Sequence, residues 1–429
     1  MHVVVIGAGI IGVTTAYCLR RQGCEVTVLE RRGGVAREAS FANGGVIAPG
    51  YTGPWAAPGA PGALLKAFFR RDAALRLKLS ADRALWRWLR QFVAASTLER
   101  YRQAKQCMYR LARYSQEEMH TLQARHAIDF EQHSGLLQVF RSDEDLARHA
   151  PLRTLLTELG APFALLTSAE CRALEPALNE HTPLAGGVRY PNDETGNCAY
   201  FARRLKEISA DDGVRYTFDS AAVGLDIRGQ RLEAVITERG ALHADACVIA
   251  AGTESAGLLA ATGIRLPLLP VKGYSATVPI ARHDLAPRVG LMDERFKVAV
   301  TRMGNRLRIA GTAVLGEASA RIDRVGVPTL LKVAGDWYPG AAGYNQAQWW
   351  AGARPTLPDG PPVLGRTPIT GLYLNAGHGS SGWAMACGAA RVLADLITGQ
   401  TPGIDLDGLT LDRFARPVLH QGRPALQSP

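Results

Sequence analysis

The chain has 429 residues, 47% hydrophobic and 21% charged, which is ordinary for a globular protein and unlike a disordered one. At roughly 100–200 residues per domain, this length predicts two or three domains. The formal net charge of +10 favours anionic partners such as phosphates or acidic lipids, although a general bias toward arginine explains it equally well. The sequence has no zinc-finger spacing, aromatic RNA-binding motif or basic tail, so we expect no nucleic-acid partner.

The cysteines and the apolar segments indicate in which cellular compartment the protein resides. The seven cysteines are widely spaced and include no C-x-x-C pair, which predicts reduced thiols in a cytosolic compartment and no metal site. The uncharged stretch Val3–Leu19 could pass for a signal-peptide core, but no basic residue precedes it and no A-x-A site follows. No other segment approaches the ~20 apolar residues of a membrane span. We therefore expect a cytoplasmic protein, soluble or peripheral on the inner face of the cytoplasmic membrane.

The N-terminus has the pattern of a strand, a glycine-rich turn, a helix and a second strand. The apolar run Val3–Ile6 is typical of a strand buried on both faces of a parallel sheet. Gly7-Ala8-Gly9-Ile10-Ile11-Gly12 follows directly, and we expect a helix over Val13–Gln22. The next strand, Val26–Leu29, ends at Glu30.

This context separates the G-x-G-x-x-G motif from a glycine turn in an unrelated α/β protein. Gly7 permits the tight turn, Gly9 lets a pyrophosphate approach the backbone, and Gly12 lets helix and strand pack closely. The helix N-terminus then faces the negative charge, and Glu30 is placed to accept hydrogen bonds from a ribose hydroxyl. The candidate cofactor-binding residues of this unit are Val3, Val4, Val5, Ile6, Gly7, Ala8, Gly9, Ile10, Ile11, Gly12, Glu30 and Arg31.

Residues 60–125 are rich in leucine, alanine, arginine and aromatic residues and contain few breakers, so we expect several helices there. Within them, Lys66–Arg71 and Arg83–Phe92 mix basic and bulky apolar residues, including Trp86 and Trp88. Such a surface suits an anionic membrane face. The more frequent alternative is a helix that packs its aromatic stripe into the core.

Short strands and helices alternate along the rest of the chain. We expect strands at 136–140, 187–190, 247–252, 297–301, 306–311 and 372–375, and helices at 152–159, 200–211 and 381–396. The runs 214–218, 222–227, 232–237 and 241–244 are predicted to form a meander. The strands between 266 and 350 indicate a separate sheet.

The N-terminal unit serves FAD and NAD alike, so it does not distinguish the two cofactors. Three later segments favour FAD. Ser40–Gly45 is a second loop of small residues, suited to wrapping the rest of a long dinucleotide. The strand Cys247–Gly252 ends in glycine, and Gly377–Gly382 lies between a strand and a helix, whose N-terminus could stabilise negative charge on a reduced flavin. The further candidate cofactor-binding residues are Ser40, Asn43, Gly44, Gly45, Gly252, Gly377, Gly379, Gly382 and Trp383.

The predicted fold class is α/β, with a Rossmann-type FAD-binding domain plus an α+β substrate domain that has a mainly antiparallel sheet. We assign residues 1–60, 190–265 and 355–416 to the discontinuous FAD-binding domain, 61–189 and 266–354 to the substrate domain, and 417–429 to a tail. The substrate is expected between the two domains.

Longer motifs make the chain similar to a known family. They are PGYxxPWAAPG at 49–59, PNDETG at 191–196, KGYS at 272–275, GARPTxPDGxP at 352–362 and NxGHGxxGW at 375–383. Through them the chain, from Val3 to about Phe414, resembles the D-amino-acid oxidase superfamily of FAD-dependent oxidoreductases, and within it the D-amino-acid dehydrogenase small-subunit type.

The resemblance implies FAD held non-covalently and oxidative deamination of D-amino acids, with electrons passed to a quinone or another respiratory acceptor. Hydride is expected to leave the substrate Cα for flavin N5, without a dedicated protein base. The alternatives are an oxygen-using D-amino-acid or glycine/sarcosine-type oxidase, and a non-catalytic flavin-binding subunit of a larger complex. No motif specifies the oligomeric state.

The resemblance also implies a carboxylate clamp at Arg354, in the G-x-R-P segment, because arginine offers a planar, bidentate and permanently charged partner. Tyr51 lies with Trp55 in a Gly/Pro-rich loop that could act as a lid. Tyr274 could add a second hydroxyl to the substrate pocket, and His378 could donate a hydrogen bond near the flavin. For each residue, a purely structural role is the alternative.

Related sarcosine-type oxidases attach flavin through a cysteine near the position of Gly352. This chain has no cysteine between Cys247 and Cys387, so we expect no covalent flavin.

Overall fold

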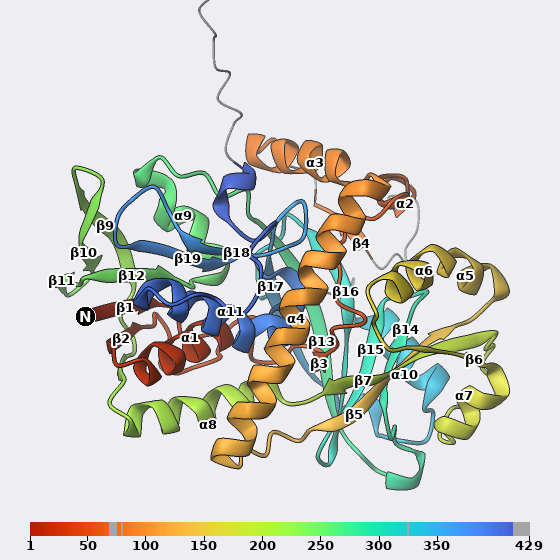
Figure 1. The fold of residues 1–429 in the computed structure, drawn as a ribbon. Helices are drawn as coiled ribbons and strands as arrows, with labels where there is room; N and C mark the ends of the chain where they lie inside the picture. The colour runs from red at the N-terminus through yellow and green to blue at the C-terminus, as the bar shows by residue number, and fades with distance from the viewer. Residues whose placement is uncertain (68–74, 79, 324–325, 415–429) are drawn as a thin grey trace, which may run out of the picture.

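The computed structural model describes residues 1–67, 75–78, 80–323 and 326–414 (Figure 1). The predicted tail and most of the basic segment Lys66–Arg71 lie outside these residues. Two sheets form the framework, and the long helix α4 (Leu98–His126) runs between them (Figure 1). This arrangement confirms the predicted α/β class.

The first sheet has six strands in the order β18-β19-β12-β1-β2-β8. All neighbours in it are parallel except β18 and β19. The strands are β1 (His2–Ile6), β2 (Glu25–Leu29), β8 (Arg215–Thr217), β12 (Ala246–Ile249), β18 (Val363–Arg366) and β19 (Leu372–Ala376). Because β1 and β12 lie inside the sheet, their side chains are buried on both faces, as the apolar runs predict.

The predicted meander is partly wrong. Residues 215–217 form β8, which pairs in parallel with β2 and so belongs to the six-stranded sheet. The meander is a three-stranded sheet of β9 (Ala222–Arg228), β10 (Arg231–Thr237) and β11 (Gly240–His243). The apolar pattern alone cannot distinguish these pairings, since β8 and β9 are both short strands.

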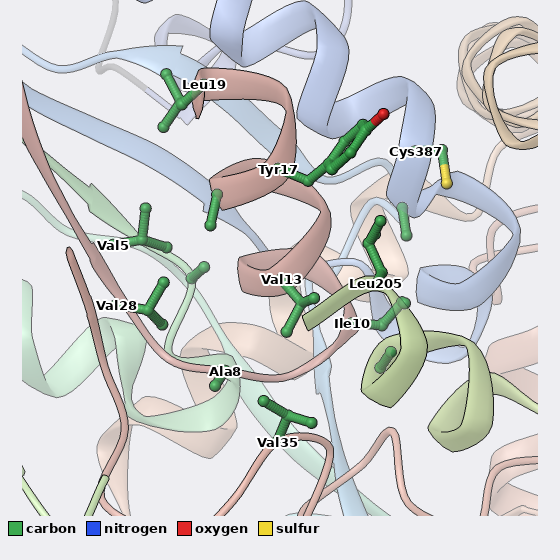
Figure 2. Packing of buried hydrophobic residues seen from close by; sticks show 14 of the residues in the cluster. Val5, Ala8, Ile10, Val13, Tyr17, Leu19, Val28, Val35, Leu205 and Cys387 are labelled. Atoms are coloured by element: carbon green, nitrogen blue, oxygen red, sulfur yellow. The ribbon is translucent and has the colours of Figure 1, made fainter. Parts of the chain in front are cut away.

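The glycine turn leads into α1 (Ile10–Arg21), which packs against α8 (Cys198–Asp211) and α11 (Gly382–Thr398). Figure 2 shows side chains of α1 in one buried cluster with Leu205 of α8 and Cys387 of α11. A Cβ at Gly12 would lie 1.8 Å from the carbonyl oxygen of Gly7. Glycine at this position therefore lets α1 pack directly against the turn.

The second sheet has ten strands and is mainly antiparallel. Its order is β17-β13-β16-β15-β14-β5-β7-β3, with β4 beside β16 and β6 beside β7. The strands are β3 (Val46–Ile47), β4 (Leu75–Leu77), β5 (His133–Phe140), β6 (Ala164–Thr167), β7 (Gly186–Thr195), β13 (Leu269–Pro279), β14 (Gly290–Asp293), β15 (Val298–Met303), β16 (Arg306–Leu315) and β17 (Gln348–Thr356). Only the pairs β14–β5 and β16–β4 are parallel.

Strand β4 lies where helices alone were expected. β15 pairs with β16 only as far as Ala310, which leaves residues 313–315 of β16 with a free edge that β4 occupies. Strands also cross the predicted domain boundaries, because β7 runs through residues 189–190 and β17 runs through residues 354–355. The two predicted domains are thus joined by continuous strands.

In the described part of the chain, a set of helices packs around the second sheet. They are α2 (Ala60–Ala67), α3 (Arg83–Ala95), α5 (Asp143–Arg148), α6 (Ala150–Glu158), α7 (Ser168–Leu174) and α10 (Val327–Trp337), while α9 (Ser255–Leu259) lies beside the meander. Among the described residues, no helix has the length and apolar character needed to cross a membrane.

Helix α3 has two different faces. Leu85, Trp88 and Phe92 are buried, and the indole N–H of Trp88 donates to the carbonyl oxygen of Thr356 at 3.1 Å. Trp86 and Val93 are exposed on the other face, next to exposed arginines at positions 83, 87 and 90. Trp88 therefore packs into the core, as the alternative interpretation predicts, whereas Trp86 lies on an exposed basic surface.

Candidate functional site

A large cavity runs between the two sheets, with a volume of about 2290 Å³. It is larger than the roughly 300–1,000 Å³ of an ordinary ligand site. Its lining begins at the glycine turn after β1 and continues to β13, β15, β16 and β17 of the second sheet. The space therefore suits a long cofactor together with a substrate.

The glycine turn forms one end of the cavity. Gly7 has a φ of 105°, a conformation that favours glycine. Gly9 precedes α1 without any side-chain cap, and the first turn of the helix carries no acidic residue. The amide of Ile10 donates to Ser40 Oγ at 3.0 Å, which holds the second small-residue loop against this helix end. An anion can approach such a helix end closely.

Glu30 is fixed beside the glycine turn. Its carboxylate accepts hydrogen bonds from the amides of Ala8, at 2.7 Å, and Arg32, at 2.8 Å. Each carboxylate oxygen has a second lone pair, so the side chain retains capacity to accept from ribose hydroxyls. The uncapped helix, the bare Gly9 and this oriented acceptor together fit the pyrophosphate and ribose of FAD.

Most predicted cofactor-binding residues line this cavity. Those that do so are Ile6, Gly7, Gly9, Ile10, Ile11, Glu30, Arg31, Ser40, Asn43, Gly44, Gly45, Gly252, Gly377, Gly379, Gly382 and Trp383. Val3, Val4, Val5, Ala8 and Gly12 do not; they are packed in the sheet or against α1 and support the turn from behind. The prediction includes these residues as part of a continuous run of sequence, but only alternate or terminal positions of a strand can face a cavity.

The Ser40–Gly45 loop is tied to the second sheet. Thr301 Oγ1 donates to the carbonyl oxygen of Gly44 at 3.0 Å, and Arg308 donates to the carbonyl oxygen of Asn43 at 3.0 Å. Asn43 also accepts from the amide of Gly45 at 3.0 Å. The loop thus connects the glycine turn to the sheet that carries Arg354.

Arg354 lies on β17 and its side chain is partly buried in the cavity lining. Within the described part of the chain, its Nη1 has no hydrogen-bond partner although that atom is buried. Burial lowers the pKa of Arg354 to about 10, so the guanidinium stays charged at neutral pH. An unpaired buried cation is costly, and an anionic group of a ligand would remove that cost.

The guanidinium of Arg354 rests on Gly273 of β13. A Cβ at Gly273 would lie 2.0 Å from Nη1, so any other residue would displace the guanidinium. Gly352, opposite Gly273 in the register, is covered in the same way by the ring of Trp350, which would lie 2.3 Å from a Cβ added there. Sequence reasoning missed this role, although both glycines lie in the KGYS and GARP motifs that carried the resemblance.

Tyr274 lines the same cavity as Arg354, but its hydroxyl is engaged by a neighbouring carboxylate. Its hydroxyl donates to Asp323 Oδ2 at 2.7 Å, and Lys272 reaches the same carboxylate at 3.0 Å. Lys272 and Tyr274 therefore share one side of β13, and Gly273 with the guanidinium lies on the other. The role of Tyr274 as a second hydroxyl in the substrate pocket stays a prediction.

His378 follows β19 and is 3% exposed, at the edge of the cavity. Burial lowers its pKa to about 3, so its ring is neutral at neutral pH. Its Nε2 has no partner among the described residues. A neutral ring in this position can donate to, or accept from, a bound group.

The loop that carries Tyr51 and Trp55 is anchored by two buried charged residues. Asp193 accepts from the amides of Gly50, at 3.1 Å, and Tyr51, at 3.3 Å. Lys105 of α4 donates to the carbonyl oxygens of Gly50 and Thr52. Burial raises the pKa of Asp193 and lowers the pKa of Lys105, while the attraction between the two charges acts against both shifts. The loop is thus held at its base, and sequence reasoning gave no role to Lys105.

The described residues contain no cluster of His, Cys, Asp and Glu able to hold a metal ion. All seven cysteines are free thiols, and none of them lines the cavity. The lining therefore offers no thiol for covalent attachment of a flavin.

Comparison with known proteins gives consistent matches. Residues 2–396 match the family described as FAD dependent oxidoreductase. A protein of Rhizorhabdus wittichii named D-amino acid dehydrogenase is 44% identical over 416 residues, which cover 96% of this chain and 100% of that protein. A protein of the same name from Agrobacterium fabrum is 42% identical over 417 residues, covering 97% and 100%.

Solved structures share the fold. Glycine oxidase from Geobacillus kaustophilus superimposes with a TM-score of 0.73 at 24% identity, over 96% of this chain and 98% of that one. L-proline dehydrogenase from P. horikoshii gives a TM-score of 0.73 at 18% identity, over 96% and 97%. The overall fold is therefore shared with these proteins.

Proposed function

The chain belongs to the family of FAD-dependent oxidoreductases, and we propose that it deaminates D-amino acids oxidatively to 2-oxo acids and ammonia. The observation that carries the proposal is the guanidinium of Arg354, whose buried Nη1 has no hydrogen-bond partner among the described residues and which lies in the same cavity as the dinucleotide-binding turn. The relatives named D-amino acid dehydrogenase, at 41–44% identity, support the choice of substrate class.

In the proposed complex, Arg354 binds the substrate carboxylate with two parallel hydrogen bonds. Gly273 gives the guanidinium a flat support on one side, so the carboxylate approaches from the open side of the cavity. This fixes the orientation of the substrate Cα, and orientation of this kind can account for much of a rate enhancement. Glu30, Ser40 and the Gly7–Gly12 turn would hold the cofactor at the other end.

Bound FAD supplies the two-electron acceptor for the hydride that leaves the substrate Cα. The substrate amine must be neutral so that its lone pair can form the C=N bond as hydride leaves, and the iminium that results passes a proton to water. The resulting imino acid is hydrolysed by water to the 2-oxo acid and ammonia. His378 stays neutral here and adds no positive charge that would oppose loss of hydride.

The electron acceptor in the proposal is a quinone or another respiratory acceptor rather than oxygen. The exposed face of α3 supports contact with an anionic lipid surface, because Trp86 and Val93 lie there with exposed arginines. Leu98, at the start of α4, is also an exposed apolar residue, and it lines the cavity. Docking by this face would bring the cavity close to a lipid-soluble acceptor.

The test of the proposed reaction is anaerobic rapid mixing of the holoenzyme with D- and L-amino acids, followed by the flavin absorbance. We expect D-amino acids to bleach the flavin, and a quinone analogue to restore its colour faster than oxygen does. Bleaching by L-amino acids alone, or by neither enantiomer, would overturn the substrate class. Faster recovery in air would overturn the acceptor.

A further inference from the structure

The turn between β14 and β15 carries a charged side chain into the cavity. Lys297, the residue before β15, has a φ of 51°, a left-handed conformation that residues other than glycine rarely adopt. Its side chain lines the cavity together with that of Glu294. Strained residues of this kind cluster at binding sites, where the surrounding structure imposes them.

The core imposes this turn through Asp293, which is fully buried. Its carboxylate accepts from the amide of Phe296 at 3.2 Å, from Trp337 Nε1 at 2.7 Å and from Arg141 Nε at 2.7 Å. The position of Lys297 is therefore fixed by the interior of the second sheet rather than by its own contacts.

Lys297 and Glu294 form an ion pair that remains open to a ligand. Lys297 Nζ donates to Glu294 Oε1, and Gln138 Nε2 donates to Glu294 Oε2 at 2.5 Å. Among the described residues, the ammonium of Lys297 has Glu294 as its hydrogen-bond partner. Two of the N–H donors of this ammonium therefore remain available. The carboxylate of Glu294 still has lone pairs to offer. The pair thus presents both a donor and an acceptor to the cavity.

The pair lies across the sheet floor from Arg354. The guanidinium rests over β13, and β16 separates β13 from β15, so two strand spacings of roughly 10 Å in total separate the two positions. The floor between them consists of the small residues Ala299, Ala310 and Gly311, which line the cavity. A methyl side chain on a substrate held by Arg354 cannot reach Lys297, whereas a side chain of several carbon atoms can.

Polar residues complete the wall around this pair. Tyr51, Tyr101 and His149 line the same part of the cavity, and burial raises the pKa of Tyr51 to about 12. His149 is 6% exposed, and both of its ring nitrogens lack partners among the described residues. These groups add neutral hydrogen-bonding capacity and no net charge.

We propose that Lys297 and Glu294 form a subsite for the substrate side chain, and that it selects a neutral carboxamide such as that of glutamine. A carboxamide accepts from Lys297 and donates to Glu294 at once. An anionic side chain would meet the carboxylate of Glu294, and a cationic one would meet the ammonium, so both charges are disfavoured. The inference rests on the proposed function, since it assumes a carboxylate held by Arg354.

The first test compares D-glutamine with D-alanine by anaerobic flavin reduction in the wild type and in Lys297→Met. Loss of a hydrogen bond to a charged group should lower the D-glutamine to D-alanine ratio of kcat/KM about tenfold or more. Lys332→Met is the matched control, because Lys297 and Lys332 are both 53% exposed and both paired with a carboxylate, but Lys332 lies outside the cavity lining. An unchanged ratio in Lys297→Met would overturn the subsite.

A second test does not depend on turnover. Calorimetric titration of the holoenzyme with glutaramate and with butyrate compares two carboxylates that lack the amine and differ in the terminal amide. We expect glutaramate to bind more tightly, with the difference lost in Lys297→Met and retained in Lys332→Met. Equal affinities in the wild type would overturn the subsite. If D-amino acids fail to bleach the flavin while glutaramate is still preferred, the proposed reaction fails and the subsite stands.

Discussion

Backbone groups of the Gly7–Gly12 turn, with the carboxylate of Glu30 beside them, face the cavity at one end, whereas side chains from several strands face it at the end formed by the second sheet. The first end depends on where glycine allows a turn and an uncapped helix, all within one short segment. The second end joins Arg354 of β17, Gly273 of β13 and Lys297 before β15. The first end fits a group common to many enzymes, and in our proposal the second determines which substrates this enzyme accepts.

The largest expected effect comes from removing the charge at the second end. Arg354→Ala should weaken binding and flavin reduction by D-amino acids by roughly 2–5 kcal/mol, because the substrate carboxylate is then desolvated without a partner. Arg354→Lys keeps the charge but loses the bidentate geometry, so its loss should be smaller. Rapid-mixing flavin reduction over a substrate concentration series measures both.

The FAD content of the Arg354 variants should stay near that of the wild type, since the two ends are built from different residues. Arg366→Ala, an exposed arginine outside the lining, is the control. If Arg354→Ala loses FAD, the arginine contributes to cofactor binding, and the two ends of the cavity do not have separate roles. Wild-type substrate affinity and flavin-reduction rate in Arg354→Ala would show that another residue binds the substrate carboxylate.

Gly273→Ala tests whether the backbone also shapes the second end. The new Cβ would occupy the place of the guanidinium, so Arg354 must move although its charge is retained. We expect a loss in kcat/KM of about tenfold to a hundredfold, in line with the cost of a misplaced binding group. Gly335→Ala, with nothing within 4 Å of its new Cβ, should behave as wild type. Unaltered kinetics in Gly273→Ala would show that the guanidinium has another resting place.

The contrast explains which parts of the site can be predicted from the sequence. The glycine turn, the helix after it and Glu30 form a local pattern with one physical reason for each residue, and the structure brings them together as expected. Arg354 was identified only through a family motif. Lys297 and Gly273 had no local signal of their role, because it arises from strand pairing and from the strained turn after Asp293.

The fold shows the same division. The βαβ unit and the α/β class follow from apolar runs and glycines, but the partner of β8 and the strand β4 do not. Both depend on which edge of a sheet remains free once the other strands have paired, a long-range property that hydrophobic periodicity does not contain. Tyr274 illustrates this at the level of one residue, since strand alternation turns its hydroxyl toward Asp323.

At the first end, Glu30→Gln should weaken FAD binding without changing substrate preference. The substitution keeps the size of the side chain but removes the charge from its hydrogen bonds, worth roughly 1.5–3 kcal/mol for a charged partner. Equilibrium titration of apoprotein with FAD measures the loss, and Glu117→Gln, at an exposed side chain outside the cavity lining, is the control. Equal FAD affinity for the wild type and Glu30→Gln would remove Glu30 from the cofactor site.

The smallest effect concerns stability and sharpens the description of the second end. Burial lowers the pKa of His149 to about 4, from an ordinary value of 6.5. Between these values the unfolded chain binds a proton that the folded chain excludes, so this contribution to stability is complete above pH 6.5 and is lost as the pH falls toward 4. Lowering the pH from 7.5 to 5.5 should therefore cost roughly 1 kcal/mol through this residue alone. His149→Phe should flatten the pH dependence of Tm over this range, because the ring nitrogens of His149 have no partners to lose among the described residues.

His181→Phe, at a side chain that is 85% exposed, should leave the pH dependence unchanged. If His149→Phe retains the wild-type pH dependence, His149 is hydrated within the cavity, and the wall around Lys297 is wetter than its burial indicates.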